Sequence, residues 1–382
     1  MKNLIIIFSL IFSFQGWISV LVAQQVVSGR ITDASNGEPL YYASIYIANS
    51  TVGTFSDKSG NYTITMPGVG SYEIVVTYLG YKSFFHKIEA PKSFHKIDIA
   101  LEKRDIELHE IVISPRYTQE DVDKFWYMLL REYPSKKGME VLNPDKVYFY
   151  FDEDSIFRAS CDEPIEIINH EMGYHILYML ESFHHDYRIN NTVFSGKPFF
   201  KELVPQNVRQ KNNWEKKRQA VYAISITHFI RALYRDKLHE EGFLLAKRDS
   251  LTKRNIYFPL SADILQKDQN SVQIVIDSPL FLACFSKPVT DKVIKNSERT
   301  MYGWGEFFPV SLLFEQQFSI FPDGTYNGTL ILHELEFRKQ ISGLSAMLPV
   351  EYGQDLPFSY INMKPGNLKA QNPTLYIDSL KK

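Results

Sequence analysis

Residues 26–114 constrain the fold of this 382-residue chain more than any other stretch. Short runs of β-branched and aromatic residues alternate there with clusters of Gly, Asp, Asn and Ser. This alternation is typical of an all-β sandwich, because strands favour extended residues and turns favour residues that bond their own backbone or tolerate left-handed φ. The apolar residues recur at period two within the runs. The pattern predicts strands at residues 26–31, 43–47, 53–55, 62–66, 72–76, 97–101 and 111–113.

Several motifs occur in a fixed order along this stretch. They are Gly29-Arg30-Ile31-Thr32-Asp33, Gly37-Glu38-Pro39-Leu40, Ala43-Ser44-Ile45, Asp57-Lys58-Ser59-Gly60-Asn61-Tyr62, Tyr78-Leu79-Gly80-Tyr81 and Leu108-His109-Glu110-Ile111-Val112-Ile113. In these residues the chain resembles the carboxypeptidase regulatory-like domain, a transthyretin-like seven-stranded β-sandwich. The resemblance covers about a quarter of the chain. Tyr41 and Tyr42 depart from the family, which usually has smaller residues before the Ala.

The resemblance implies a non-catalytic front module. In that family the domain is an accessory to a catalytic domain and carries no active site. It also stands at the front of TonB-dependent receptors and of other envelope proteins of Gram-negative bacteria. We therefore interpret Asp57, Gly60 and Tyr81 as turn and core residues. An outer-membrane transporter is not expected, because no long ladder of amphipathic strands follows residue 114.

Residues 1–23 are predicted to be a secretory signal peptide. Lys2 precedes an apolar run at residues 4–14, and Ala23 supplies the small residue that cleavage needs. Gln15 and Gly16 interrupt the run before it reaches the roughly 20 apolar residues of a spanning helix. We expect an exported protein of the periplasm or the outer-membrane surface, not an integral membrane protein.

Length and charge narrow the class of protein further. The chain is long enough for two domains, and its net charge of −2 makes nucleic acid an unexpected partner. The predicted fold class is β-rich, with the N-terminal transthyretin-like seven-stranded β-sandwich followed by an α+β domain. The predicted organisation is a signal peptide at 1–23, the sandwich at 24–114, a linker and helix at 115–145, the α+β domain at 146–350 and an irregular tail at 351–382.

The region after the sandwich mixes helical and extended patterns. Thr118 is expected to cap a helix that has acids in its first turn and ends at Pro134. Strands at 147–151, 155–159, 164–168 and 173–183 suggest a meander, and a helix is predicted over 219–238. Further strands are expected at 272–276, 280–285 and 312–320, before a hairpin turn at 321–325 that leads into 326–332.

A looser resemblance extends into this region. Ile168-Asn169 through Gly173-Tyr174, Gly196 with Phe199-Phe200, and residues 223–233 resemble the C-terminal half of exported proteins that share the front module. That half has no assigned chemistry, so the resemblance implies no catalytic residue.

Four histidine groups have spacings that invite a metal site. His170 and His175 are five residues apart, whereas a zinc-protease helix needs them four apart on one face. His333 and Glu336 match the H-x-x-E pair of zinc carboxypeptidases, but no later His follows to complete that order. The remaining two groups are His86 with Glu89 inside the sandwich, and the adjacent His184, His185 and Asp186. Neighbours on a strand point to opposite faces, so polar surface residues are the favoured interpretation.

No other motif supports catalysis. Residues 343–347 resemble a nucleophile elbow but lack its second Gly. His228 is interpreted as a hydrogen-bonded core histidine. The sequence therefore assigns no catalytic, cofactor-binding or metal residue, and no cofactor is expected.

Two features remain open. Segment 209–218 carries five basic residues around Trp214. A solvated helix face is the favoured interpretation, and an outer-membrane protein, a glycan or a lipid head group is the candidate partner. Cys161 and Cys284 could pair in an oxidising compartment or remain two buried thiols.

These observations favour an exported, non-catalytic cell-envelope protein that acts in binding or assembly. The alternative is an exported hydrolase with its active site in the C-terminal domain. A pocket with converging carboxylates or a nucleophile–base pair would favour the alternative. The sequence leaves the ligand and the oligomeric state open.

Overall fold

The computed structural model describes most of the chain between residues 25 and 354. The described residues are 25–90, 95–104, 117–152, 155–248, 251, 255–260, 264–276, 280–285, 288–292, 294, 310–314, 318–328, 330–334 and 347–354. The predicted signal peptide, the expected strand at 111–113 and most of the 343–347 motif lie outside them. Within these ranges no helix is long and apolar enough to cross a membrane.

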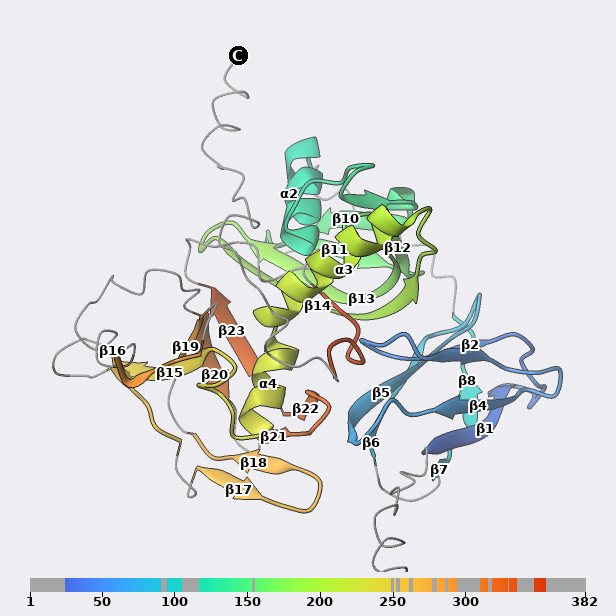
Figure 1. Ribbon diagram of the computed structural model, residues 1–382. Helices are drawn as coiled ribbons and strands as arrows, with labels where there is room; N and C mark the ends of the chain where they lie inside the picture. The colour runs from blue at the N-terminus through green and yellow to red at the C-terminus, as the bar shows by residue number, and fades with distance from the viewer. Residues whose placement is uncertain are drawn as a thin grey trace, which may run out of the picture.

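The N-terminal part is a sandwich of two four-stranded sheets, as predicted (Figure 1). One sheet holds β1 (Val26–Asp33), β4 (Asn61–Thr65), β7 (His95–Lys96) and β8 (Ile99–Leu101). The other holds β2 (Ser44–Ile47), β3 (Gly53–Phe55), β5 (Gly70–Thr77) and β6 (Phe84–Ala90). β7 and β8 run one after the other, parallel to β1, and together take the place of one strand of the expected seven.

The core of the sandwich follows from the period-two pattern. Ile31, Ile45 and Ile74 are fully buried between the sheets. Burying one such side chain contributes about 1.5–3 kcal/mol. Val350, from the far end of the described chain, also packs in this core.

The next part is a six-stranded sheet covered by one helix. Its strands are β9 (Met139–Val141), β10 (Val147–Phe151), β11 (Phe157–Cys161), β12 (Ile165–Asn169), β13 (Tyr174–Asp186) and β14 (Asn191–Glu202), and a 3₁₀ turn, Pro144–Lys146, precedes β10. The expected meander is wrong, because the order is β10-β11-β13-β12-β9. β14 pairs along one edge of the long strand β13, so β11 and β12 share its other edge.

The covering helix, α2 (Gln119–Leu130), begins where the sequence predicted. The Thr118 side chain accepts from the backbone N–H of Asp121, and the Asp121 carboxylate accepts from that of Thr118. This reciprocal cap stabilises a helix start. Phe125 and Leu129 are fully buried against the sheet. The helix ends at Leu130, ahead of Pro134, because Arg131 adopts left-handed φ.

The single helix predicted over 219–238 is two helices. They are α3 (Val208–Ala223) and α4 (Ile226–Tyr234). The chain breaks at Ile224, and the Ser225 hydroxyl caps α4 by accepting from the His228 backbone N–H. The predicted apolar stripe does lie on α4, where Phe229, Ile230 and Leu233 are buried.

Two further sheets enclose α4. One contains β15 (Phe243–Arg248), β16 (Asn255–Tyr257), β19 (Leu280–Cys284), β20 (Val310–Phe314) and β23 (Leu330–Glu334). The other contains β17 (Leu265–Lys267), β18 (Val272–Ile274), β21 (Phe318–Ile320) and β22 (Tyr326–Asn327). The predicted strand 312–320 is therefore two strands in two sheets. β21 and β22 form the expected hairpin around Gly324.

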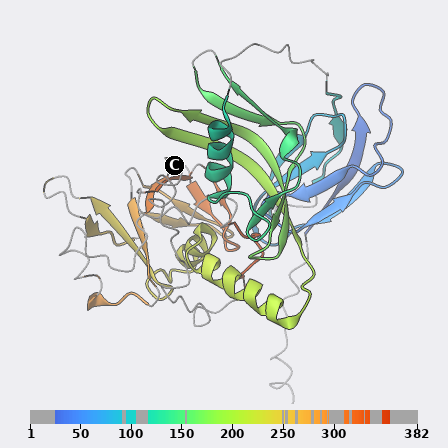
Figure 2. The same ribbon diagram turned by 90° about the horizontal axis from the view of Figure 1, so that it is seen from above.

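The sandwich, the six-stranded sheet and the α4 region meet at one junction (Figures 1 and 2). Segment 347–354, drawn in red, lies between the blue sandwich and the yellow-green helices in Figure 1. The predicted range 146–350 thus holds two hydrophobic cores, one under α2 and one around α4. The domain boundaries stay predictions.

Candidate binding pocket at the domain junction

The sandwich contacts the six-stranded sheet through an apolar surface. Phe199 on β14 packs on Tyr46 of the sandwich, with ring centroids 5.0 Å apart, and on Val75. A Cβ at Gly53 would lie 2.8 Å from the Phe199 ring, so the two parts approach as closely as glycine allows. This contact sets one wall of the junction.

Backbone hydrogen bonds extend the same contact. The Asn49 N–H donates to the Pro198 carbonyl at 2.7 Å, and the Phe200 N–H donates to the Ser50 carbonyl at 3.0 Å. The Asn49 carbonyl in turn accepts from the Val350 N–H at 2.7 Å. One sandwich turn therefore holds both β14 and segment 347–354.

A polar cluster joins the sandwich to the β21–β22 hairpin. The Tyr72 hydroxyl donates to the Asp323 carboxylate at 2.6 Å, and the Ser71 N–H donates to the Thr325 hydroxyl at 2.8 Å. Thr325 also donates to Asp323 through its N–H and its hydroxyl. Burial raises the pKa of Asp323, and these bonds and the charge of Arg231 oppose that rise. The carboxylate is costly to bury and depends on all of its donors.

Arg231 fastens segment 347–354 to α4. Its side chain is 1% exposed and donates to the carbonyls of Asp323, Val350 and Tyr352. It also donates to the Tyr222 hydroxyl at 3.1 Å. A guanidinium offers five donors, so one side chain can anchor a hairpin and a loop together.

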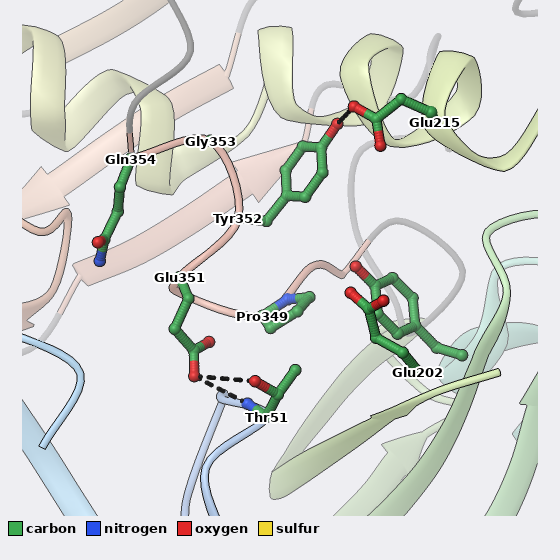
Figure 3. Close-up of a pocket in the computed structure, with 9 residues that line it drawn as sticks. Thr51, Glu202, Glu215, Pro349, Glu351, Tyr352, Gly353 and Gln354 are labelled. Atoms are coloured by element: carbon green, nitrogen blue, oxygen red, sulfur yellow. Dashed lines mark hydrogen bonds between the residues drawn. The ribbon is translucent and has the colours of Figure 1, made fainter. Parts of the chain in front are cut away.

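These contacts border an open pocket of about 370 Å³ (Figure 3). The sandwich, the six-stranded sheet, α3 and segment 347–354 each contribute to its wall. Its lining residues are Thr51, Tyr174, Glu202, Glu215, Pro349, Glu351, Tyr352, Gly353 and Gln354. Gly353 has φ +78° and touches the Tyr222 ring, so only glycine fits this turn without strain.

Two of the three pocket carboxylates hold the wall together. One Glu351 oxygen accepts from the N–H of Thr51 at 3.0 Å and from its hydroxyl at 3.2 Å. One Glu215 oxygen accepts from the Tyr352 hydroxyl at 2.7 Å. Figure 3 shows both pairs as dashed lines on two sides of the pocket.

The third carboxylate lies next to a buried arginine. Glu202 is the register partner of Tyr174 across β13 and β14. Arg218 reaches Glu202 at 3.3 Å, and its guanidinium lies 4.0 Å above the Tyr174 ring. The shortest bond of Arg218 goes to the Met172 carbonyl at 2.8 Å, so the arginine is shared between this carbonyl and Glu202.

Three polar atoms on the pocket wall have no hydrogen-bond partner among the described residues. They are the Tyr174 hydroxyl, Oε2 of Glu351 and Nε2 of Gln354. Tyr174 is 0% exposed. Burial raises the pKa of Tyr174 and of Glu351. The pocket thus presents acceptors, one neutral hydroxyl and one amide donor.

The sequence-predicted histidine groups lie elsewhere. His170 and His175 bond different carboxylates, Glu140 at 2.8 Å and Glu166 at 3.2 Å. His86 is exposed on β6, and Glu89 accepts from Asn327. The His333 side chain and Glu336 lie outside the described residues.

The adjacent trio His184, His185 and Asp186 alternates between faces of β13, as expected for a strand. His185 is buried and bonds the Thr192 hydroxyl at 2.7 Å, whereas Asp186 pairs with Arg188. Among the described residues, no group of three His, Cys, Asp or Glu side chains could hold a metal ion.

Three further sequence interpretations concern one histidine and the two cysteines. His228 is a hydrogen-bonded core residue, as predicted, with bonds to the Ala223 carbonyl and to Glu241. Cys161 on β11 and Cys284 on β19 are both free thiols, and Cys284 is buried whereas Cys161 is half-buried. Burial raises the pKa of Cys284 to about 12, so this thiol is unreactive at neutral pH.

The basic segment 209–218 forms most of α3 and does not present one basic face. Trp214 is buried and donates to the His170 carbonyl. Arg218 points inward, and Lys217 pairs with Glu171 at 2.6 Å. Arg209, Lys211 and Lys216 remain exposed.

Family comparison identifies the front module. Residues 27–113 match the family model of the CarboxypepD_reg-like domain. This segment is a CarboxypepD_reg-like domain. A regulatory-like domain is not itself catalytic, and this agrees with the prediction that carboxypeptidase activity is not expected. It supplies Thr51 to the pocket. No curated protein matches the chain.

Solved structures resemble the chain only weakly. One chain of a type II cohesin–X–dockerin complex of Acetivibrio cellulolyticus is 18% identical to this protein. The match covers 21% of this chain and 59% of that chain, with a TM-score of 0.19. The pilus 2b backbone protein of group B streptococcus is 16% identical, over 22% and 42%, with a TM-score of 0.19. A putative membrane-associated protein of unknown function from Bacteroides fragilis is 13% identical, over 48% and 84%, with a TM-score of 0.17. The chain spans less than two thirds of the first two.

Sequence reasoning missed the pocket residues. Glu202, Glu215 and Glu351 lie on a strand end, a helix and a loop, in stretches without a chemical motif. The one local signal for a pocket residue was Gly173-Tyr174, which is part of the resemblance to the C-terminal half of exported proteins that share the front module. Gly173 has φ +69° and lies against the Trp214 ring, and this packing positions Tyr174.

Proposed function

We propose that this protein is an exported cell-envelope protein that works by binding, and that the junction pocket is its binding site. The observation that carries the proposal is the construction of the pocket wall. Four separate parts of the chain converge there and leave buried polar atoms without partners. The CarboxypepD_reg-like domain contributes one wall, which gives this non-catalytic module a part in the binding site.

The pocket volume suits a small ligand. About 370 Å³ lies at the lower end of the roughly 300–1,000 Å³ of ligand sites. Two hydroxyl–carboxylate contacts lie on its wall, Thr51 with Glu351 and Tyr352 with Glu215, and both fasten segment 347–354. The same Glu351 oxygen also accepts the Thr51 backbone N–H, an arrangement that suits anchoring better than activation of a nucleophile.

The test is native mass spectrometry of protein purified from the envelope fraction. We expect a mature chain that begins near Gln24 and carries a small molecule, which is absent from a Glu351→Gln, Glu215→Gln double variant. Bulk protein that begins at Met1 in the cytoplasm would contradict export. Wild type and double variant with identical masses of bound material would contradict a role for the pocket.

An exported hydrolase is the second candidate. Three carboxylates line one pocket, and the raised pKa of Glu351 is a property that general acids share. Incubation with isolated envelope glycans and peptides, followed by mass spectrometry, separates the two functions. New hydrolysis products that disappear in Glu351→Gln would favour the hydrolase, and unchanged bound material would favour binding.

We also propose that the start of α3, with Val204, Val208, Arg209 and Lys211, contacts the envelope surface. Val204 and Val208 are 89% and 73% exposed next to Arg209 and Lys211. Apolar side chains beside cations suit an anionic lipid surface. Sedimentation with phosphatidylglycerol vesicles should weaken in an Arg209→Glu, Lys211→Glu variant. Lys216→Glu, on the same helix, is the matched control, and an equal loss in the control would contradict this surface.

A further inference from the structure

The unpartnered polar atoms are concentrated at the junction pocket. Five buried side-chain atoms in the described part of the chain have no hydrogen-bond partner, and three of them line this one pocket. Buried polar groups almost always have partners, because an unmet bond is costly. Their concentration at one site indicates that a ligand completes the bonding there.

The charge of the wall indicates the sign of the ligand. Glu202, Glu215 and Glu351 line the pocket, and none of its nine lining residues is basic. The nearby Arg218 pairs with Glu202 at 3.3 Å and donates to backbone carbonyls, so Glu215 and Glu351 are the carboxylates without a basic partner on the described wall. A cation is therefore favoured over an anion or a carboxylate-bearing molecule.

The polar atoms indicate what the cation must also carry. Oε2 of Glu351 accepts hydrogen bonds, whereas Nε2 of Gln354 donates one. The Tyr174 hydroxyl can do either. A ligand that satisfies all three needs N–H donors and an oxygen acceptor, as an ammonium group beside a hydroxyl provides.

We propose that the junction pocket binds a small hydroxyl-bearing primary ammonium ion, of the amino sugar or amino alcohol class. The inference rests on the proposed function of the pocket as a binding site. Glu351 accepts from the ammonium group, Glu215 adds negative charge from the other side of the pocket, and Gln354 donates to a ligand hydroxyl. The hydroxyl of Tyr174, on strand β13, forms the remaining hydrogen bond to the ligand.

The tyrosine offers a clean variant. Tyr174→Phe removes a hydroxyl that has no protein partner and keeps the ring under Arg218. Tyr46→Phe is the matched control, because its hydroxyl is also buried and unpartnered but lies outside the pocket. Both variants should melt at or above the wild-type temperature, so a difference between them reports on ligand binding.

The experiment is calorimetric titration of the full chain with glucosamine, ethanolamine and glucose. Glucosamine and glucose differ by the amine, so the first should bind and the second should not. Ethanolamine distinguishes an amino alcohol from a sugar ring. Tyr174→Phe should weaken glucosamine binding about tenfold, Glu215→Gln should weaken it at least as much, and Tyr46→Phe should leave it unchanged.

Three outcomes decide between the inferences. Glucosamine binding that depends on Tyr174 and weakens with added salt supports the proposal. Glucose binding of equal strength that depends on Tyr174 overturns the ammonium class and leaves the binding function standing. Equal glucosamine titrations for Tyr174→Phe and Tyr46→Phe overturn the inference, and the mass of envelope-purified protein then decides separately whether the pocket binds anything.

Discussion

The sandwich is held to the rest of the chain by two contacts of opposite character. On β14 the contact is apolar, with Phe199 against Tyr46 and Val75. On the hairpin and segment 347–354 it is polar, with Asp323 and Glu351 as acceptors. The apolar contact gains free energy by removing surface from water and does not depend on protonation. The polar contact depends on groups whose pKa values burial raises, so its strength varies with pH.

The largest expected effect is on the apolar contact. Phe199→Ala should lower the free energy of unfolding by about 3 kcal/mol, because a large buried ring leaves a cavity. Urea unfolding at neutral and mildly acidic pH should give the same loss. Val193→Ala, an exposed position on the same strand, is the control and should change stability by less than about 0.5 kcal/mol. A loss no larger than the control would contradict the role of this contact.

A steric change at the polar contact should have a smaller effect. A Cβ at Gly70 would lie 2.3 Å from Oδ2 of Asp323, so Gly70→Ala forces the sandwich and the hairpin apart. We expect a loss of about 1–3 kcal/mol in urea unfolding. Gly68→Ala is the matched control, since its Cβ would meet only the Tyr72 hydroxyl at 3.7 Å. Equal losses in the two variants would argue against close packing at Asp323.

The pH dependence sharpens the comparison. The pKa of folded Asp323 is raised, so its contribution to stability is present below the unfolded pKa and is lost as pH rises through the folded pKa. Tyr72→Phe removes a donor to the carboxylate and should raise that pKa further. We expect a loss of about 1–3 kcal/mol at neutral pH and a smaller one in acid.

The control for this pH dependence lies inside the sandwich. Tyr62 donates to the Ile97 carbonyl at 2.9 Å, a partner that does not titrate. The loss caused by Tyr62→Phe should therefore be the same at both pH values. A Tyr72→Phe loss that does not change with pH would show that Asp323 keeps one protonation state throughout.

The smallest expected effect is at the exposed end of the polar contact. Thr51→Ala removes one of the two donors to Glu351 and keeps the backbone donor. We expect a loss of about 0.5–1 kcal/mol by thermal unfolding. A larger loss of stability for Thr51→Ala than for Gly70→Ala would contradict this ranking, because it would make the Glu351 contact more important than the Asp323 contact.

The sequence by itself determined the elements that local patterns specify. Period-two apolar residues located the sandwich strands, and the Thr118–Asp121 cap located the start of α2. The sequence did not indicate β6, because its first four residues do not alternate between apolar and polar. In the structure these four residues are exposed or only partly buried. The predicted helix also began too late, at residue 219, because the buried residues in the first part of α3 are Trp214 and Arg218 instead of an aliphatic stripe.

Only the tertiary structure decided the strand order and the pocket. β11 pairs with β13 because β14 occupies the other edge of β13, a competition that no single strand pattern records. Thr51 meets Glu351 across 300 residues, and Tyr72 meets Asp323 across 251. Sequence periodicity reports which face of an element is apolar. Polar contacts between distant segments leave no periodicity, so they emerge only when the apolar faces have packed and brought those segments together.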